Sequence, residues 1–288
     1  MNKSMFKSRL VIGSANFSQS YGADKTLVNL KEKNKIINLA KANKIYNIDT
    51  AQSYLKKKNI FKNLNNKFNF FTKVIPDNQW ISFEMCQKQI EDHFMSFGNH
   101  KVETLLFHDT KILFSKYGNK IFENLEILKK KKYFTKIGLS IYDVNCLNKL
   151  ITNYNFDVVQ CPYNILDTRI LKSGWYEKLK VSGIEIHVRS IFLQGLLVNK
   201  SYHKNKYFKK WQKYFSEWFN YLNKNSVSPI DYCLSDLLKY DFDKIIVGVN
   251  NSKNLNEIVN FKNINKNKMV NLDINDKKLI DPRNWRLK

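Results

Sequence analysis

Residues 103–139 read ETLLFHDTKILFSKYGNKIFENLEILKKKKYFTKIGL. A short apolar run at 103–107 opens this stretch, and a second one at 135–139 closes it. Between them, apolar residues recur every three or four positions from Ile121 to Leu128, with lysine and glutamate on the opposite face. Two apolar strands joined by one amphipathic helix form a βαβ unit with parallel strands, and this unit indicates an α/β fold.

The same alternation extends along the whole chain of 288 residues. Apolar runs typical of strands buried on both faces occur at 10–13, 45–48, 70–74, 103–107, 135–139, 157–161, 184–188 and 244–249. Amphipathic patterns that predict helices lie at 33–43, 83–97, 121–130, 144–153, 175–182 and 255–261. Eight such strands predict a (β/α)8 TIM barrel, a fold that needs about 250 residues. We therefore expect one barrel domain over residues 1–288.

A doubly wound open sheet is the alternative fold. That fold binds dinucleotides at a glycine-rich turn after its first strand, with the pattern G-x-G-x-x-G. The segment after the first predicted strand lacks this pattern between Gly13 and Gly22. The barrel is therefore the favoured prediction.

Residues 199–240 form a longer connection than the others, and they are rich in aromatic residues and lysine. Aromatic rings interleaved with lysine can stack on nucleic-acid bases. Rings at helical spacing more often form a buried stripe. We expect packing rather than base stacking for Phe208, Trp211, Phe215, Trp218 and Leu222.

The formal net charge is +24, from 49 basic and 25 acidic residues. Only five of the basic residues are arginine, the residue that dominates bidentate recognition of phosphates and bases. Lysine is spread along the chain, and asparagine, isoleucine, phenylalanine and tyrosine are also abundant, as AT-rich codons would produce. We interpret the charge as coding bias and expect no nucleic-acid partner. A polyanion-binding protein is the alternative, and its signature would be tight binding that weakens steeply with salt.

The four cysteines, Cys86, Cys146, Cys161 and Cys233, are far apart and form no C-x-x-C pair. This spacing argues against a zinc site or a disulfide framework, and we interpret the thiols as small buried hydrophobes. No apolar run reaches the length of about 18 residues that a transmembrane helix needs, and residues 1–9 lack the apolar segment of a secretory signal. We expect a cytoplasmic protein without membrane association, and the sequence leaves its oligomeric state open.

Three successive predicted strands end in side chains that can move a proton. The second strand leads into Asp49 and Tyr54, the third reaches Lys73, and the fourth leads into His108. Catalytic groups of a (β/α)8 barrel lie at the C-terminal ends of the strands, so these four residues are expected at one rim.

The four side chains make a coherent proton relay. A tyrosine with an ordinary pKa of about 10 is a poor acid at neutral pH, and a lysine cation beside the phenol lowers that pKa. Asp49 supplies the counter-ion that a buried Lys73 needs, while His108 can hold a substrate oxygen beside Tyr54. Singly, each residue also has a structural interpretation, such as a helix N-cap for Asp49 or a hydrogen-bonded buried imidazole for His108. Their joint order favours chemistry.

Three motifs carry a family resemblance: D-T-A-x-x-Y from Asp49 to Tyr54, T-K ending in Lys73, and L-x-H-D around His108. Together they resemble the aldo-keto reductase superfamily over about residues 10–258, and the family's catalytic tetrad falls on Asp49, Tyr54, Lys73 and His108. The resemblance implies an NAD(P)H-dependent oxidoreductase that reduces a carbonyl to an alcohol, or the reverse, without a metal. Its expected partner is a small carbonyl or alcohol. The segment VRSIFLQGLL at 188–197 is similar to a bacterial branch often found with surface-sugar biosynthesis, which suggests a sugar-related substrate.

The resemblance also implies where the cofactor binds. The expected positions are Gly13, Ser14, Ser140, Gln160, Asn164, Arg189, Ser190, Phe192, Gln194, Gly248, Asn250, Lys253, Asn254 and Glu257. Of these, Ser140, Gln160 and Asn164 are expected at the nicotinamide carboxamide. The loop at 190–194 is expected at the pyrophosphate, and the segment at 248–257 at the adenosine phosphate.

Two positions depart from the family pattern. Arg189 stands where the family often has an aromatic residue that stacks on the nicotinamide, although a guanidinium can also stack or bind an anionic substrate group. Asn254 stands where a basic residue is frequent, with Lys253 beside it. NADP is the expected cofactor, and NAD stays open. A non-catalytic nicotinamide-binding sensor is the alternative function, against which the intact tetrad argues.

Overall fold

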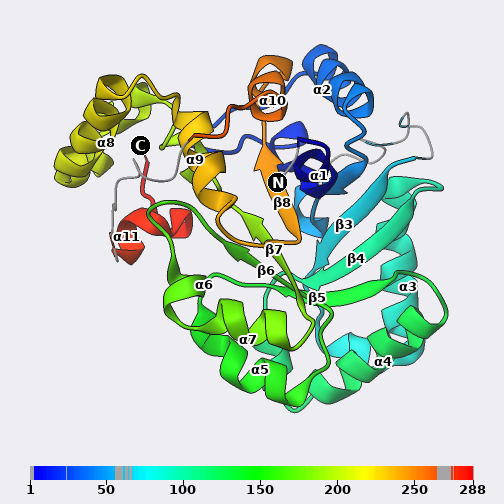
Figure 1. The fold of residues 1–288 in the computed structure, drawn as a ribbon. Coiled ribbons are helices and arrows are strands. Elements are labelled where there is room, and N and C mark those ends of the chain that lie inside the picture. Colours follow the sequence, from blue (N-terminus) through cyan, green and yellow to red (C-terminus); the bar gives the residue numbers. More distant parts are fainter. Residues whose placement is uncertain are drawn as a thin grey trace.

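The strands of the chain close into one parallel barrel in the order β1 to β8, as a computed structural model shows (Figure 1). The structure describes residues 3–23, 25–55, 61, 64, 67–264, 274 and 276–287. The strands are β1 (Leu10–Gly13), β2 (Asn47–Asp49), β3 (Asn69–Val74), β4 (Lys101–Phe107), β5 (Lys136–Ser140), β6 (Val158–Pro162), β7 (Glu185–Arg189) and β8 (Lys244–Gly248). The predicted (β/α)8 barrel is confirmed, and no predicted strand end differs from the observed one by more than two residues.

The barrel strands are short and buried on both faces, because helices cover their outer side and side chains fill the interior. All five residues of β6 are buried, and so are the last five of β3. This explains why the strands read as continuous apolar runs in the sequence rather than as an alternation of apolar and polar residues.

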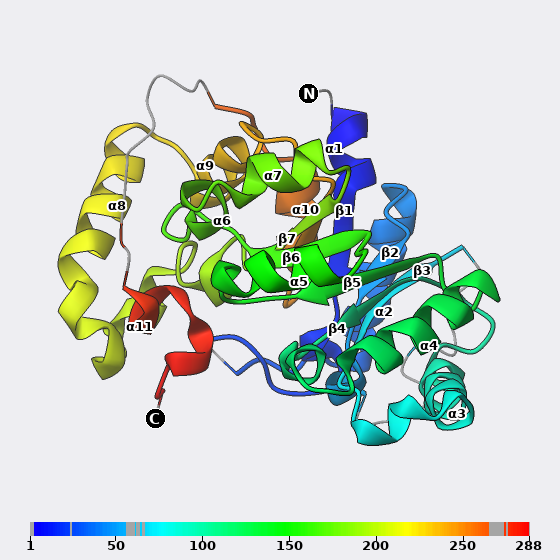
Figure 2. The ribbon, with the colours of Figure 1, turned by 90° about the horizontal axis from the view of Figure 1, so that it is seen from below.

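Helices surround the barrel, and Figures 1 and 2 show them on the outside of the sheet. They are α1 (Lys3–Arg9), α2 (Leu30–Ala42), α3 (Phe83–Phe94), α4 (Gly118–Lys130), α5 (Leu147–Asn153), α6 (Arg169–Lys172), α7 (Trp175–Val181), α8 (Gln212–Lys224), α9 (Pro229–Leu237), α10 (Ser252–Val259) and α11 (Lys277–Ile280). Side-chain caps fix several starts: Asn29 accepts from an N–H in the first turn of α2, Ser82 does so for α3, and Ser228 does so for α9, which begins with a proline. Each of the six predicted helical patterns overlaps a helix, although α2, α4 and α10 each begin three residues earlier than predicted.

The N-terminal helix α1 was not predicted, because its sequence offers a single large aromatic anchor instead of an apolar stripe. That anchor is Phe6, which is buried and packs its ring 4.6 Å from the ring of Phe261. Tertiary packing, which no local pattern reveals, therefore stabilises this helix.

The long connection at residues 199–240, which is rich in aromatic residues, forms α8 and α9, with short helical turns before α8. The five residues of the predicted stripe are all buried. Trp218 donates from Nε1 to the carbonyl oxygen of Leu197, and Phe208 packs edge-to-face on Trp285 of the C-terminal segment, with 4.9 Å between ring centroids. Figure 2 shows α8 and α11 along the same side of the barrel. The prediction of packing rather than base stacking is confirmed.

The cysteines are free thiols, and Cys86, Cys161 and Cys233 are buried as expected. The expectation was wrong for Cys146, which is partly exposed where a short helical turn leads into α5. Among the described residues, no helix combines the length and the hydropathy that crossing a membrane requires.

Candidate active site

Asp49 and Lys73 form a buried ion pair at the C-terminal rim of the barrel. Lys73 Nζ donates to Asp49 Oδ1 over 2.5 Å and to the backbone oxygen of Thr50 over 2.9 Å. Only 2% of the Lys73 side chain and 6% of the Asp49 side chain are exposed. The expected counter-ion for Lys73 is thereby confirmed. Because a buried charge without its partner is very unfavourable, each residue of this pair requires the other.

The second carboxylate oxygen of Asp49 is also occupied. Gln160 on β6 donates from Nε2 to Asp49 Oδ2 over 2.8 Å, and Ser140 on β5 donates to Gln160 Oε1 over 3.2 Å. All three residues are buried. A hydrogen-bonded chain therefore crosses the barrel from β5 to β2 and fixes the orientation of the carboxylate.

Tyr54 lies on a single helical turn, Gln52–Tyr54, directly after β2. Lys73 Nζ lies 5.6 Å from the centroid of its ring. Burial raises the pKa of Tyr54 well above its ordinary value, and Tyr21 and Asp49 add to the rise. The predicted lowering of this pKa is therefore wrong for this structure, because burial is the largest cause of the shift. The phenol is protonated at neutral pH and can act as a proton donor.

His108 follows β4 and stands edge-to-face to Tyr54, with 5.8 Å between ring centroids. Its Nδ1 lies 3.5 Å from the hydroxyl of Ser53. Burial, followed by the nearby Lys73 charge, lowers the pKa of His108 to about 4. The imidazole is thus neutral at physiological pH and can donate one hydrogen bond to an oxygen placed beside the phenol.

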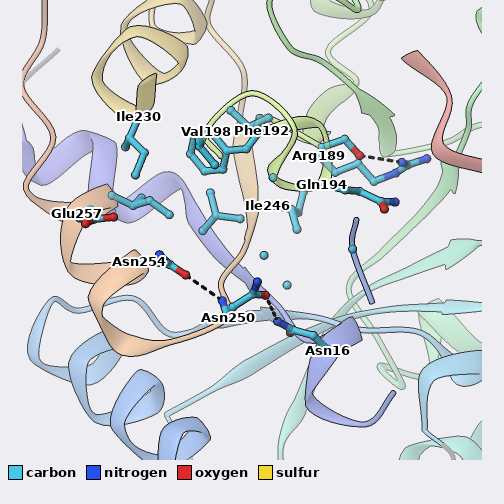
Figure 3. Close-up of a pocket in the computed structure, with 18 of the residues that line it drawn as sticks. Asn16, Arg189, Phe192, Gln194, Val198, Ile230, Ile246, Asn250, Asn254 and Glu257 are labelled. Carbon is cyan, nitrogen blue, oxygen red and sulfur yellow. Dashed lines mark hydrogen bonds between the residues drawn. The ribbon is translucent and has the colours of Figure 1, made fainter. Parts of the chain in front are cut away.

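A cavity of about 770 Å³ extends from this group of residues to the start of α10. Its volume falls in the range of about 300–1,000 Å³ that is usual for small-molecule sites. Figure 3 shows Arg189, Gln194 and Phe192 toward one end and Asn250, Asn254 and Glu257 toward the other. Of the predicted site residues, the cavity wall includes Gly13, Ser14, Asp49, Tyr54, Lys73, Arg189, Ser190, Phe192, Gln194, Gly248, Asn250, Asn254 and Glu257.

Five predicted residues lie off this wall. Ser140 and Gln160 stand behind Asp49, and His108 stands beside Tyr54. Asn164 donates to the backbone oxygen of Ser190 over 3.1 Å, which ties the end of β6 to the loop after β7. Lys253 is exposed on the first turn of α10, so its contact with a phosphate stays a prediction.

The loop after β7 has an unusual backbone. Ser190, Leu193 and Gln194 adopt positive φ angles of 61°, 46° and 52°, and Gly195 follows at 93°. Each non-glycine residue in this region costs about 1–3 kcal/mol, so the surrounding structure must stabilise the loop. Turns that alternate between right-handed and left-handed conformations direct backbone N–H groups into a concavity, which is a common anion site.

Arg189 is the last residue of β7, and its side chain lines the cavity. Its Nη2 donates to the backbone oxygen of Ile141 over 3.0 Å. Its guanidinium carbon lies 3.9 Å from the ring centroid of Tyr142, and that of Arg283 lies 3.7 Å from the same centroid. Arg283 is paired with Asp281, whereas Arg189 has no salt bridge within the part of the chain that the structure describes. Arg189 is thus an uncompensated cation on this wall.

The end of the cavity beside α10, where the resemblance predicts the adenosine phosphate, contains an acceptor without a donor among the described residues. Asn16 donates from Nδ2 to the backbone oxygen of Val249 and to the side chain of Asn250, as Figure 3 shows for the second bond. Its Oδ1 is buried and has no partner among the described residues. Because a buried acceptor without a donor is unfavourable, this atom is suited to a ligand that brings one.

The sequence analysis missed Asn16, Tyr21, Tyr142 and Arg283. Tyr21 lines the cavity, bonds Gln194, and has its pKa raised to about 12, mainly by burial. None of these residues belongs to a motif, and Arg283 is distant in the sequence from the strand ends.

The remaining histidines have structural partners. His187 on β7 is buried, shares a 3.0 Å hydrogen bond with Glu185 and stacks on Phe71. His93 on α3 shares a 2.8 Å hydrogen bond with Thr72. Hydrogen bonds and packing therefore fix the positions of both rings.

Solved structures share the fold of this chain. An aldo-keto reductase of Bacillus halodurans in its holo form superposes with a TM-score of 0.71 at 16% identity, covering 90% of this chain and 89% of that one. A glycerol dehydrogenase of Gluconobacter oxydans superposes with a TM-score of 0.67 at 15% identity, covering 90% of this chain and 88% of that one. No curated protein matches the chain significantly. The sequence model of the aldo/keto reductase family matches residues 9–278. The chain is therefore a member of the aldo/keto reductase family.

Proposed function

We propose that this protein is a nicotinamide-dependent oxidoreductase that interconverts a carbonyl and an alcohol at Tyr54, within one barrel domain that spans the chain. The observation that carries the proposal is the arrangement at the rim. A protonated, partly buried Tyr54 stands beside the Asp49–Lys73 ion pair and a neutral His108. Membership of the family supports the same class of reaction.

The cavity fits a dinucleotide cofactor. The unpaired Oδ1 of Asn16 is suited to a ligand donor at one end, and the turns from Ser190 to Gly195 suit a pyrophosphate. A Cβ added at Gly248 would meet no atom within 4 Å, so the backbone there leaves open space beside the cavity. A bound nicotinamide would supply the hydride that the carbonyl carbon accepts.

Side chains of the protein would transfer the proton to the substrate. Tyr54 holds a proton on its phenol and releases it to the carbonyl oxygen as that oxygen gains charge. His108, neutral at physiological pH, hydrogen-bonds the same oxygen and orients it. Lys73 stabilises the phenolate that remains, and Asp49 holds the ammonium in place.

The charge of the site favours an anionic substrate. The charges of Asp49 and Lys73 cancel, and Arg283 is paired with Asp281, so Arg189 is a cation beside the catalytic group that has no salt bridge among the described residues; Lys262, Asp231 and Glu257 also line the cavity. A guanidinium binds carboxylates and phosphates in bidentate fashion. A sugar-derived carbonyl that carries an acidic group satisfies both this charge and the resemblance of residues 188–197.

The test is a reduction assay on the purified protein with NADH and NADPH. Aldehydes, ketones and sugar-derived carbonyls are supplied in turn, and cofactor oxidation is followed by absorbance. Turnover of at least one carbonyl is expected. Cofactor binding without turnover across the panel would favour the sensor alternative instead.

A further inference from the structure

The first turn of α10 begins beside the adenosine end of the cavity, and a carboxylate from another helix occupies it. Figure 1 shows α2 and α10 side by side on the outside of the barrel. Glu32 of α2 accepts two hydrogen bonds on Oε1, from the backbone N–H and the hydroxyl of Ser252, each 2.6 Å long. Ser252 lies two residues from both Asn250 and Asn254, which line the cavity.

The other donors of this turn are also used internally. Asn254 N–H donates to the side chain of Asn251 over 2.9 Å, and Asn250 N–H donates to Asn254 Oδ1 over 3.3 Å. A helix N-terminus binds an anion through such N–H groups. Here three N–H groups, those of Asn250, Ser252 and Asn254, already donate to side-chain oxygens of the protein itself.

The charge at this turn opposes a further anion. The two hydrogen bonds from Ser252 lower the pKa of Glu32, so the carboxylate is ionised at neutral pH. Glu257 adds a second carboxylate to the cavity wall. Lys35 lies 3.4 Å from the other oxygen of Glu32, but 55% of its side chain is exposed, and solvent screens an ion pair of this kind. Residues 248–262 contain no arginine and two lysines, Lys253 and Lys262, which are both exposed to solvent.

We propose that this turn selects NAD over NADP, and that Glu32 is the residue that disfavours the 2′-phosphate. The inference rests on the proposed function, because it concerns the cofactor of the same site. A 2′-phosphate carries close to two negative charges at neutral pH and needs cationic or N–H partners. A ribose 2′-hydroxyl carries no charge and can donate to a carboxylate or amide oxygen. This choice replaces the sequence-based expectation of NADP.

The experiment is calorimetric titration of the full-length protein with NADH and with NADPH, which measures binding without turnover. For the wild type, NADH is expected to bind at least about tenfold more tightly than NADPH. Glu32→Gln removes the charge and keeps the shape, so NADPH affinity should rise by about fivefold to tenfold while NADH affinity changes by less than about twofold. The control is Glu123→Gln, which neutralises an exposed carboxylate on α4 and should leave the ratio of the two affinities unchanged.

Each contrary outcome has its own meaning. Equal or tighter NADPH binding by the wild type would overturn the inference and leave the proposed function standing. A preference for NADH that Glu32→Gln does not reduce would overturn the role of Glu32. If neither cofactor binds, both the proposed function and the inference fail.

Discussion

Gln160 donates a 2.8 Å hydrogen bond to Asp49 across 111 residues of sequence. The same carboxylate binds Lys73 through its other oxygen. The amide expected at a nicotinamide carboxamide is thereby coupled directly to the ion pair beside Tyr54. Two parts of the site that the sequence presents separately form one buried network.

The first prediction concerns the stability of the ion pair. Lys73→Met leaves the Asp49 carboxylate buried without its cation and should reduce the free energy of unfolding by about 3–5 kcal/mol, measured by urea denaturation. The double variant Asp49→Asn with Lys73→Met removes both charges and should recover more than half of that loss. A Lys73→Met protein as stable as the wild type would contradict the assigned pairing.

The fold was largely predictable because the C-terminal ends of parallel strands meet at one rim. Asp49, Lys73 and His108 could be brought together from strand order alone. Their protonation could not, since whether Lys73 acts on Tyr54 or on Asp49 depends on a side-chain direction that the sequence does not encode. The predicted direction of the Tyr54 pKa shift was wrong because burial is the largest cause of that shift, and burial depends on tertiary packing.

Other parts of the site depend on contacts between distant segments. Arg283 reaches Tyr142 from the C-terminal segment, and Glu32 reaches Ser252 from α2. No periodicity or motif marks these pairs. The alignment of strand ends therefore predicted which side chains meet at the rim, while the contacts of Arg283 and Glu32 required the three-dimensional structure.

The second prediction is a flat pH profile for carbonyl reduction. The pKa of His108 is lowered to about 4, so the imidazole stays neutral above that pH. The pKa of Tyr54 is raised, so the phenol keeps its proton into alkaline solution. The kcat/KM for reduction should thus vary by less than about threefold between about pH 5 and about pH 9. A loss of activity between about pH 6 and about pH 7 would show that His108 titrates near its ordinary pKa, contrary to this account.

The third prediction concerns substrate charge. Arg189→Gln should lower kcat/KM for 4-oxobutanoate by at least about tenfold, because its carboxylate loses a charged partner. The neutral analogue butanal should change by less than about threefold. Arg286→Gln, at an exposed arginine, is the matched control. Equal losses for both aldehydes would assign Arg189 to the cofactor or to the fold instead.

The fourth prediction separates packing from binding at two glycines. A Cβ at Gly138 would lie 2.2 Å from the backbone oxygen of Val158, whereas a Cβ at Gly248 would meet nothing within 4 Å. Gly138→Ala should therefore destabilise the barrel by about 1–3 kcal/mol or more. Gly248→Ala should keep the wild-type melting temperature and weaken cofactor affinity, because Gly248 lines the cavity. Unchanged affinity in Gly248→Ala would place the cofactor away from β8.

The central claim is that Tyr54 donates the proton. Its most direct test is single-turnover reduction of a carbonyl by Tyr54→Phe, alongside Tyr214→Phe at a tyrosine that is 40% exposed on α8. Tyr54→Phe is expected to bind cofactor with wild-type affinity and to reduce the carbonyl about 100-fold to 10,000-fold more slowly, while Tyr214→Phe matches the wild type. A Tyr54→Phe protein that reduces its substrate at the wild-type rate would contradict the account.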